Sequence, residues 1–568
     1  MNEADTHWQL LARCSEFNRG GAPDARNTLT PTKQDLASLD LRAAPARYES
    51  GAVGARPPGE CDGASIAAVG ARLAGECASL TATLILFVAA LITSPATAEP
   101  WAAPGDLRLR HDLQLLNDSG VTNVPLTTWP LSWGDIDRSL AGIRTGELPP
   151  AVGDAYARVR ERLRWETGDG TQLRLSAAAA GNPRIVRAFE NTPREDGEVS
   201  AGVSWFGDRL ALKLSTSAVM NSFDGDEVRP DGSYLGLGLG NWMLSAGWQN
   251  RWWGPGRDGS LILSHNARPM PGIAIQRNMN TPFESKWLRW IGPWSLTAFM
   301  NQLDDERIVS DALLFGLRVT FRPIDSLEIG LSRTAQWCGD DRPCDFDAFT
   351  DLLLGNDNRG VNVDPNEEPG NQLAGIDIRW VLPRGMPAAL YMQWIGEDTR
   401  QGGPEIGSWL RQAGIEHWGQ IAGLDHRTHV EVSDTTCREG GFGFSDSKTN
   451  CAYEHSIYRT GYRYKGRAIG YGTDGDGLTY SLGSTWVQPG GHSWNLTLRY
   501  IELNRAGAPD ARHTLTATPQ ELADVQLTHD RLTRFGRLHV GLGVSRLDDE
   551  ASGESSTDVT GFVQWVME

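Results

Sequence analysis

The residues best suited to chemistry in this 568-residue chain are concentrated between Asn250 and Arg307. This stretch combines tryptophan with arginine, asparagine and carboxylates. Tryptophan rings can cover the apolar faces of sugars, while planar polar groups bind hydroxyls and carboxylates. The candidate polysaccharide-binding residues are Trp252, Trp253, Arg257, Asp258, Asn266, Arg268, Glu284, Lys286, Trp287, Asp305 and Arg307. The alternative is that the tryptophans pack or form a membrane girdle, while the charged residues pair inside the fold.

Catalytic and metal-binding patterns are weak. The chain contains no nucleophile elbow, phosphate-binding loop or His-Glu-x-x-His motif. His426 and His429 would point to opposite faces of a strand, and Asp474–Asp476 lacks the distal glutamate of a calcium loop. The carboxylates of Asp304–Glu306 could serve glycoside cleavage, although a solvated loop is the simpler interpretation. We therefore expect no enzyme, cofactor or metal.

The composition indicates what kind of fold must position these residues. With 64 glycines and 21 tryptophans, the chain can bury too much aromatic area to be disordered. Its longest apolar run is shorter than the roughly 18 residues of a membrane helix, and its mean hydropathy is −0.36. A net charge of −18 disfavours nucleic acid as a partner, because phosphates require a basic face.

From Thr171 onward the hydrophobic pattern has a period of two, as in Leu210–Thr216 and Leu314–Phe321. We count roughly sixteen to twenty such segments of about ten residues, most of them separated by turn residues. Alternation of this length, with aromatic residues at the segment ends, is typical of transmembrane β-strands. Val559–Glu568 is one such strand at the C-terminus, and closing it onto the sheet would leave no exposed edge. The pattern predicts an all-β transmembrane barrel over residues 167–568.

Residues 99–166 instead have helical periodicity. Asp106–Leu116 places leucines on one face, Ser132 is a plausible N-cap for a second helix, and Pro149-Pro150 precedes a third over Val152–Trp165. We expect a small N-terminal helical subdomain.

The first 98 residues do not resemble the rest. Leu80–Ile92 is apolar and is followed by Ala96-Thr97-Ala98, which predicts a signal peptide over residues 69–98 with cleavage between Ala98 and Glu99. Residues 18–41 match residues 504–527 at 16 of 24 positions. We interpret residues 1–68 as a mis-annotated start, with a genuine extension as the alternative.

Four cysteines remain after the expected cleavage, as the close pairs Cys338/Cys344 and Cys437/Cys451. An even number at short spacing in an exported chain predicts two loop disulfides. A zinc site is the alternative, but the spacing does not match paired Cys-x-x-Cys motifs.

Four segments resemble the capsule assembly protein Wzi family: Val124–Ile136, Trp253–Ile275, Pro282–Met300 and Tyr453–Asp476. The resemblance implies an eighteen-stranded barrel in the Gram-negative outer membrane, with a periplasmic helical bundle. It also implies lectin-like attachment of capsular polysaccharide without catalysis. Expected partners are this polysaccharide, outer-membrane lipid and lipopolysaccharide. The family's sugar contacts do not form a compact motif that can be transferred to this chain, and the oligomeric state is not predicted.

Two other functional classes fit the same residues. A barrel of about eighteen strands is wide enough for an aqueous lumen, so a porin-like channel for sugars or other solutes is the second hypothesis. An exported glycan-cleaving or glycan-modifying enzyme is the third. Conductance would distinguish the channel, and product release from purified polymer would distinguish the enzyme.

The expected processing predicts a specific mature terminus. N-terminal sequencing of the exported protein should find Glu99 as the first residue, because Ala96 and Ala98 provide the small side chains that signal peptidase needs. A mature chain that retains Arg26 would contradict the mis-annotated start.

Overall fold

The computed structural model describes residues 100–168, 170–354, 370–383, 385–399, 406–439, 447–505, 507 and 515–567. The expected extension (1–68), the signal peptide (69–98) and the cleavage point between Ala98 and Glu99 lie outside this part of the chain. No helix among the described residues is both long enough and apolar enough to cross a membrane.

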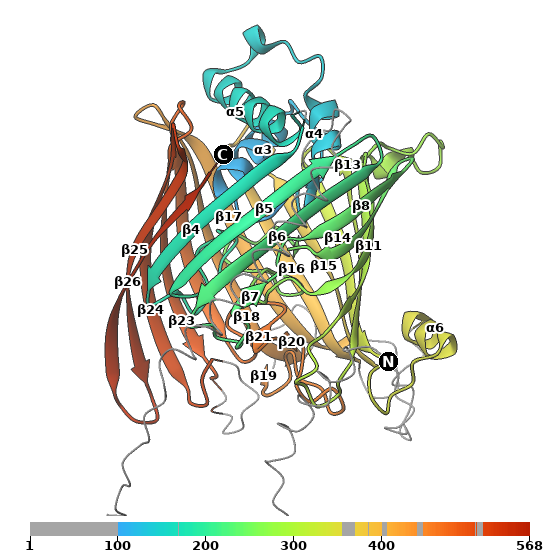
Figure 1. The fold of residues 1–568 in the computed structure, drawn as a ribbon, viewed down its shortest axis with the longest axis vertical. Coiled ribbons are helices and arrows are strands. Elements are labelled where there is room, and N and C mark those ends of the chain that lie inside the picture. The colour runs from blue at the N-terminus through green and yellow to red at the C-terminus, as the bar shows by residue number, and fades with distance from the viewer. Residues whose placement is uncertain are drawn as a thin grey trace, which may run out of the picture. The chain divides into compact units, whose positions relative to one another are not determined.

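A closed antiparallel sheet dominates the described residues (Figure 1), and eighteen strands of six to sixteen residues form its wall. In chain order these are β4 (Gln172–Gly181), β5 (Gly197–Phe206), β6 (Leu210–Met220), β8 (Tyr234–Leu239), β9 (Trp242–Trp248), β11 (Pro271–Arg277), β12 (Trp294–Gln302), β13 (Leu313–Ile324), β14 (Leu327–Trp337), β15 (Gly370–Val381), β16 (Ala388–Thr399), β17 (Ile406–Ile421), β18 (Leu424–Glu439), β22 (Leu478–Val487), β23 (Ser493–Leu503), β24 (Gln520–Thr533), β25 (Gly536–Asp549) and β26 (Ser555–Val566). The short strands β7 (Val228–Arg229) and β19 (Ser447–Lys448) join the same sheet. The predicted barrel of about eighteen strands is confirmed.

Side chains alternate between the lumen and the outer wall along each strand. In β13, Arg318 and Thr320 are fully buried inside the barrel, whereas Phe315 and Val319 lie on the opposite face. A lipid-facing wall favours the apolar set and a packed lumen can accommodate the polar set. This is why the sequence pattern has a period of two over most of the chain.

The two ends of the barrel differ in their connections. At one end the links are short, such as the two-residue turns Asp325-Ser326, Ala422-Gly423 and Arg534-Phe535. At the other end most connections are longer, such as those that follow β14 and β18. We call these the short-turn end and the long-loop end. The helices that precede the barrel and the C-terminus lie at the short-turn end (Figure 1).

Three α-helices precede the barrel, as expected: α3 (Leu107–Asp118), α4 (Trp133–Leu140) and α5 (Pro150–Glu166). A single 3₁₀ turn, η2 (Thr145–Glu147), connects α4 to α5. The side chains of Asp106 and Ser132 cap the first two helices by accepting hydrogen bonds from Leu109 N and Asp135 N. Pro150 opens α5, a position where the missing N–H has no cost.

Helix α3 is fixed to the barrel wall by buried charges, so the helices are not an independent appendage. Asp118 at the end of α3 accepts hydrogen bonds from Arg379 of β15 and Arg427 of β18, each at 2.8 Å. Arg110 donates to the carbonyl of Pro255 at 2.7 Å, inside the barrel. Because such charges are stable away from water only when paired, α3 must occupy the mouth of the barrel.

A two-stranded ladder continues this connection into the lumen. Strand β2 (Thr128–Trp129) pairs with β10 (Trp252–Trp253), while β1 (Trp101–Ala102) pairs with β3 (Leu131–Ser132) beside it. Arg318 of the barrel wall donates to the Thr128 hydroxyl at 2.8 Å. The N-terminal segment therefore forms part of the filling of the barrel.

Three connections from the long-loop end fold into the lumen, namely residues 182–196, 249–270 and 451–477, which we call the plug. Tyrosine hydroxyls of the third segment donate hydrogen bonds to backbone carbonyls of the second. Tyr453 donates to the Leu261 carbonyl at 2.7 Å, and Tyr462 donates to the Ile262 carbonyl at 2.9 Å. All four residues are fully buried. The plug thus has its own core, built from residues far apart in sequence.

The four cysteines of the barrel form two disulfides, Cys338–Cys344 and Cys437–Cys451. The first closes a short loop directly after β14. The second joins Cys437, near the end of β18, to Cys451, the first residue of the third plug segment, with Cα atoms 5.9 Å apart. The N-terminal end of the third plug segment is therefore attached covalently to wall strand β18, in addition to its connections along the chain.

The buried contacts of α3 generate a stability prediction. Asp118→Ala should lower the free energy of unfolding by about 3 kcal/mol, because it leaves Arg379 and Arg427 with an incomplete set of partners away from water. Circular dichroism during denaturant unfolding of the detergent-solubilised protein measures this.

The matched control is Asp137→Ala, which removes the partner of Arg160 in an ion pair that is 61% exposed on the aspartate side. Exposed pairs contribute at most about 1 kcal/mol, so this variant should unfold like the parent. Equal destabilisation by the two variants would contradict the structural role of Asp118.

Candidate functional site

Six of the eleven predicted sugar-binding residues are buried inside the plug: Trp252, Trp253, Arg257, Asp258, Asn266 and Arg268. The Trp252 ring lies 5.2 Å from the ring of Phe189, and Arg257 donates to Glu416 at 2.8 Å. In this structure these side chains contact protein on all sides. The interpretation of the tryptophans and charges as internal packing is the one that the structure favours for them.

Asp258 and Asn266 also form hydrogen bonds with other protein groups. Asp258 accepts a hydrogen bond from Arg499 of β23 at 2.6 Å, and Asn266 donates to the Ala468 carbonyl at 2.9 Å. Their hydrogen bonds hold plug segments to the wall and to one another.

Glu284, Lys286 and Trp287 lie in the connection between β11 and β12, at the short-turn end. This connection contains the 3₁₀ turn η3 (Arg289–Ile291). All three predicted residues are exposed, and Trp287 is 87% exposed. They are accessible, but they lie at the opposite end of the barrel from the long loops.

Asp305 and Arg307 lie at the long-loop end, in residues 303–312. Arg307 is buried and donates to the carbonyls of Arg463 and Gly461, each at 3.1 Å, whereas Asp305 is exposed. The eleven predicted residues are therefore spread over three regions and do not form one site. The reason is that the chain turns inward after β9 and returns to the wall at β11, which separates neighbours in sequence.

The structure reveals a different polar and aromatic surface at the long-loop end. A hairpin of β20 (Arg463–Tyr464) and β21 (Arg467–Ala468) projects from the third plug segment. Together with the loops beside it, this hairpin exposes one aromatic ring, one aliphatic side chain and three charges. We call this surface the hairpin platform, and its residues are Ile185, Phe223, Asp226, Lys465 and Arg467.

An exposed ring and a guanidinium form the centre of the platform. The guanidinium of Arg467 lies over the Phe223 ring, 4.5 Å from its centroid, and donates to the Ile185 carbonyl at 3.1 Å. Phe223 is 56% exposed and Ile185 is 46% exposed. The arrangement orients a planar cation beside an accessible aromatic face.

Lys465 links the hairpin to two neighbouring loops. Its ammonium lies 3.0 Å from Asp226, and its backbone N–H donates to Asp304 at 3.2 Å. Arg268 also pairs with Asp226, at 2.8 Å. Two of the predicted residues, Arg268 and Asp305, therefore border the platform, because Asp305 follows Asp304 in the chain.

The carboxylates beneath the platform are held ionised. Burial alone would raise the pKa of the Asp226 carboxyl, but hydrogen bonds from Lys465 and Arg268 outweigh it and lower that pKa. In the same way, hydrogen bonds from Arg268 and Ser222 hold the pKa of Asp224 below its ordinary value against the effect of burial. The charge pattern of the platform is thus stable across the physiological pH range.

The hairpin itself is a tight turn. Lys465 and Gly466 both adopt positive φ, 48° and 70°, as the two central residues of a type I′ turn do. A side chain at position 466 would come within 3.0 Å of the Phe223 ring, so glycine also permits that close approach. A glycine-containing two-residue turn between Tyr464 and Arg467 is the sequence signal that could have identified this hairpin.

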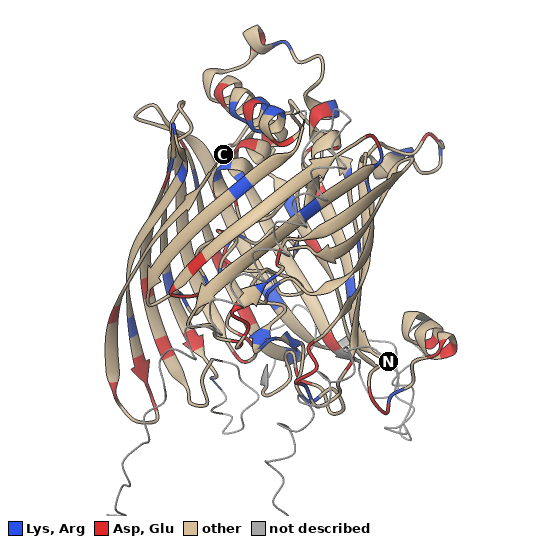
Figure 2. Cartoon of the chain, viewed as in Figure 1, with Lys and Arg blue, Asp and Glu red and all other residues tan. Residues whose placement is uncertain are grey.

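Charges differ across the long-loop end. In Figure 2, basic residues lie around β20 and β21 near the middle of the barrel, whereas acidic residues mark the tips of β24, β25 and β26. No cluster of three or more histidine, cysteine or carboxylate side chains with the arrangement of a metal site occurs among the described residues. The platform therefore offers binding groups in the form of cations, an aromatic face and one carboxylate.

Comparison with known proteins identifies the family. The sequence profile described as capsule assembly protein Wzi matches residues 167–554. The chain belongs to the capsule assembly protein Wzi family. An uncharacterised 55.8 kDa protein from the cps region of Klebsiella pneumoniae is 34% identical over 338 residues, which cover 58% of this chain and 64% of that protein.

A solved relative has the same barrel. Wzi of Escherichia coli, described as an outer-membrane protein involved in group 1 capsule assembly and as a carbohydrate-binding β-barrel, is 27% identical to this chain. The two structures align with a TM-score of 0.70, over 82% of this chain and 99% of the relative. Membership of the Wzi family and the closed barrel place this chain in the outer membrane.

The location gives the two ends their orientation. Outer-membrane barrels have short periplasmic turns and longer extracellular loops, so helices α3, α4 and α5 face the periplasm and the hairpin platform faces the exterior. Glu284, Lys286 and Trp287 then lie on the periplasmic side.

The plug generates a conductance prediction. In planar bilayers the purified protein should give little or no steady single-channel current, because three chain segments and α3 occupy the lumen of an otherwise wide barrel. A reproducible, long-lived conductance of porin size would contradict this and support the channel hypothesis.

Proposed function

We propose that this member of the Wzi family is a non-enzymatic lectin that attaches exported capsular polysaccharide to the cell surface and supports capsule assembly. The observation that carries the proposal is the hairpin platform, in which Arg467 lies over the exposed ring of Phe223 at the extracellular end.

The chemistry of the platform suits a sugar polymer. The free face of Phe223 can cover the apolar C–H face of a sugar ring, and Ile185 extends the apolar area beside it. Arg467 and Lys465 supply donors for hydroxyls and for any carboxylates of an acidic repeat unit. Asp226 can accept hydrogen bonds from hydroxyls, as carboxylates do in sugar sites.

Local charge matters more here than total charge. The chain carries a net charge of −18, which does not attract an acidic polymer. Basic residues lie around β20 and β21, among acidic ones, and apart from the acidic tips of β24–β26 (Figure 2). Within a Debye length of about 8 Å, a bound repeat unit experiences these cations together with their carboxylate partners, such as Asp226, rather than the charge of the whole chain.

The platform is also preorganised. Its hairpin turn has a fixed backbone conformation, and the ion pair of Lys465 with Asp226 holds it against the next loop. A surface that is already ordered loses less entropy when it binds, which favours attachment of a flexible polymer.

The proposal predicts specific losses of binding. Phe223→Ala and Arg467→Ala should each weaken binding of capsular polysaccharide from the producing strain by about 2- to 30-fold, the loss expected when an aromatic or cation–π contact of about 0.5–2 kcal/mol is removed. Binding to the purified, immobilised barrel is measured by surface plasmon resonance. Polymer recovered from the surface should keep its original length, as expected for binding without cleavage.

The matched control is Trp287→Ala, which removes an exposed aromatic side chain at the periplasmic end and should leave binding unchanged. Parental binding by both platform variants would contradict the site, whereas shortened polymer would contradict the non-enzymatic function. In cells, a deletion strain should lose cell-bound capsule and release free polymer.

A further inference from the structure

A short helix lies outside the barrel at the extracellular end. Helix α6 (Phe346–Leu354) follows the Cys338–Cys344 disulfide and packs on the outer wall rather than in the lumen (Figure 1). Its Phe349 ring contacts the outward side chains Phe315 and Trp337, with ring centroids 5.5 Å and 4.8 Å away. Phe315 belongs to the lipid-facing set of β13, so α6 covers part of the surface that the membrane would otherwise contact.

The C-terminus of α6 is fixed by a charge on the same wall. Arg333 of β14 belongs to the outward-facing set, because its neighbours Ser332 and Thr334 are buried inside. It donates to the Leu353 carbonyl at 2.6 Å and to the Gln372 side chain at 2.8 Å. A cation at a helix C-terminus is favourable, and the contact shields a charge that would be costly against lipid.

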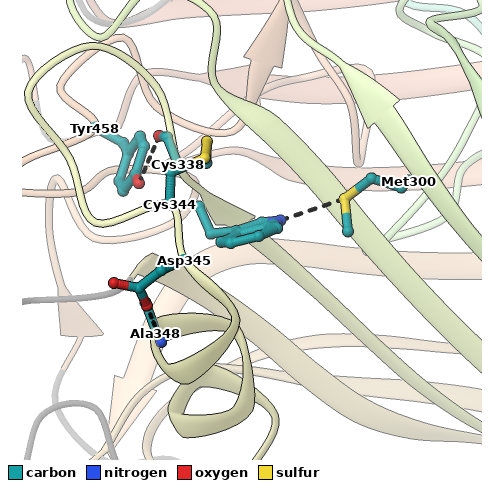
Figure 3. The surroundings of a disulfide bond; sticks show 7 residues. Met300, Cys338, Cys344, Asp345, Ala348 and Tyr458 are labelled. Carbon is teal, nitrogen blue, oxygen red and sulfur yellow. Dashed lines mark hydrogen bonds between the residues drawn. A yellow bond between two sulfur atoms is a disulfide. The ribbon is translucent and has the colours of Figure 1, made fainter.

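The N-terminus of α6 is equally constrained (Figure 3). Asp345 accepts a hydrogen bond from the backbone N–H of Ala348 at 2.8 Å, and Tyr458 of the plug donates to the Cys338 carbonyl at 3.0 Å. Trp337 donates to the sulfur of Met300 at 3.2 Å. The helix is therefore held on the wall by a disulfide-closed loop, a cap and packed aromatic rings.

An apolar hollow continues from α6 along the outer wall. It has a volume of about 510 Å³ and is lined by strands β8, β9, β11, β12 and β13 together with Phe349 of α6. The paired positions Leu235, Ala246, Ile273, Met300 and Phe315 form one row across five neighbouring strands. Small residues at Ala246 and Ala298 create the depression, and Met300 and Phe315 belong both to the hollow and to the surface under α6.

We infer that α6 and this hollow form a binding site for an acyl chain of lipopolysaccharide. The row lies near the extracellular ends of its strands, and α6 closes the hollow at that end. The outer leaflet is therefore the one that can supply the chain, and in the Gram-negative outer membrane this leaflet is built from lipopolysaccharide. The exposed Phe346 ring, 75% accessible in the structure, is a further apolar surface that a neighbouring acyl chain would cover.

The inference is independent of the polysaccharide site, since the hollow faces lipid and the hairpin platform faces the exterior above the lumen. A lipid bound here would stabilise the position of α6 on the outer wall. It would also anchor the long loop that carries the Cys338–Cys344 disulfide at the membrane surface.

Native mass spectrometry tests the inference. The full-length barrel is extracted from outer membranes in a mild detergent, and the fraction that carries a lipopolysaccharide mass is measured. The parent should retain one bound lipopolysaccharide. Ala298→Trp fills the hollow and should reduce the bound fraction at least fivefold. Ala523→Trp, at an exposed outward position of β24, is the matched control and should keep it.

Phe349→Ala tests the same site from the helix and leaves every barrel strand unchanged, so barrel folding does not depend on it. It too should lower the bound fraction. Parental lipopolysaccharide retention in Phe349→Ala, or in folded Ala298→Trp, would overturn the inference. Retention of phospholipid in place of lipopolysaccharide would overturn it as well.

Discussion

Every backbone amide and carbonyl at membrane depth needs a hydrogen-bond partner, because hydrocarbon offers none. Here the need is met by closure, since the last strand β26 pairs with the first barrel strand β4. Closing eighteen strands creates a wide interior, and that interior must hold water or protein. In this chain it holds protein, and the buried arginines and carboxylates of wall, plug and α3 pair with one another. The plug, the position of the helices and the exposed loops all depend on this closure.

Filling the lumen determines which surface remains for a polymer. Plug side chains that bond to the wall, such as Arg257 with Glu416 of β17, hold the plug in place and are not available to a ligand. Only the parts of the plug that reach the extracellular end stay accessible, and the hairpin of β20 and β21 is one of them. The candidate site is thus a consequence of how the plug is folded, and the same charges that stabilise its base also orient its exposed groups.

Much of this architecture was predictable from the sequence, because its signals are local. The period of two in β13, the N-cap Ser132 and the spacing of Cys437 and Cys451 all depend on residues close together in the chain. The burial of Trp252 and Trp253 inside the barrel could not be predicted, since a tryptophan beside arginine suits a sugar site and a buried core equally well. Helix α6 presents the same difficulty. Its sequence permits a helix, but only the register of β13 and β14 shows which wall it covers.

The Cys437–Cys451 disulfide has a mechanical consequence. A polymer attached to the hairpin of β20 and β21 would transmit shear from the surroundings of the cell into the third plug segment. The disulfide passes that load directly to β18, a sixteen-residue strand hydrogen-bonded to neighbours on both sides. The force is then carried by covalent bonds into a membrane-embedded wall, rather than by the non-covalent packing of the plug. Tension on the capsule would accordingly load the barrel as a whole before it extracts the segment that holds the polymer.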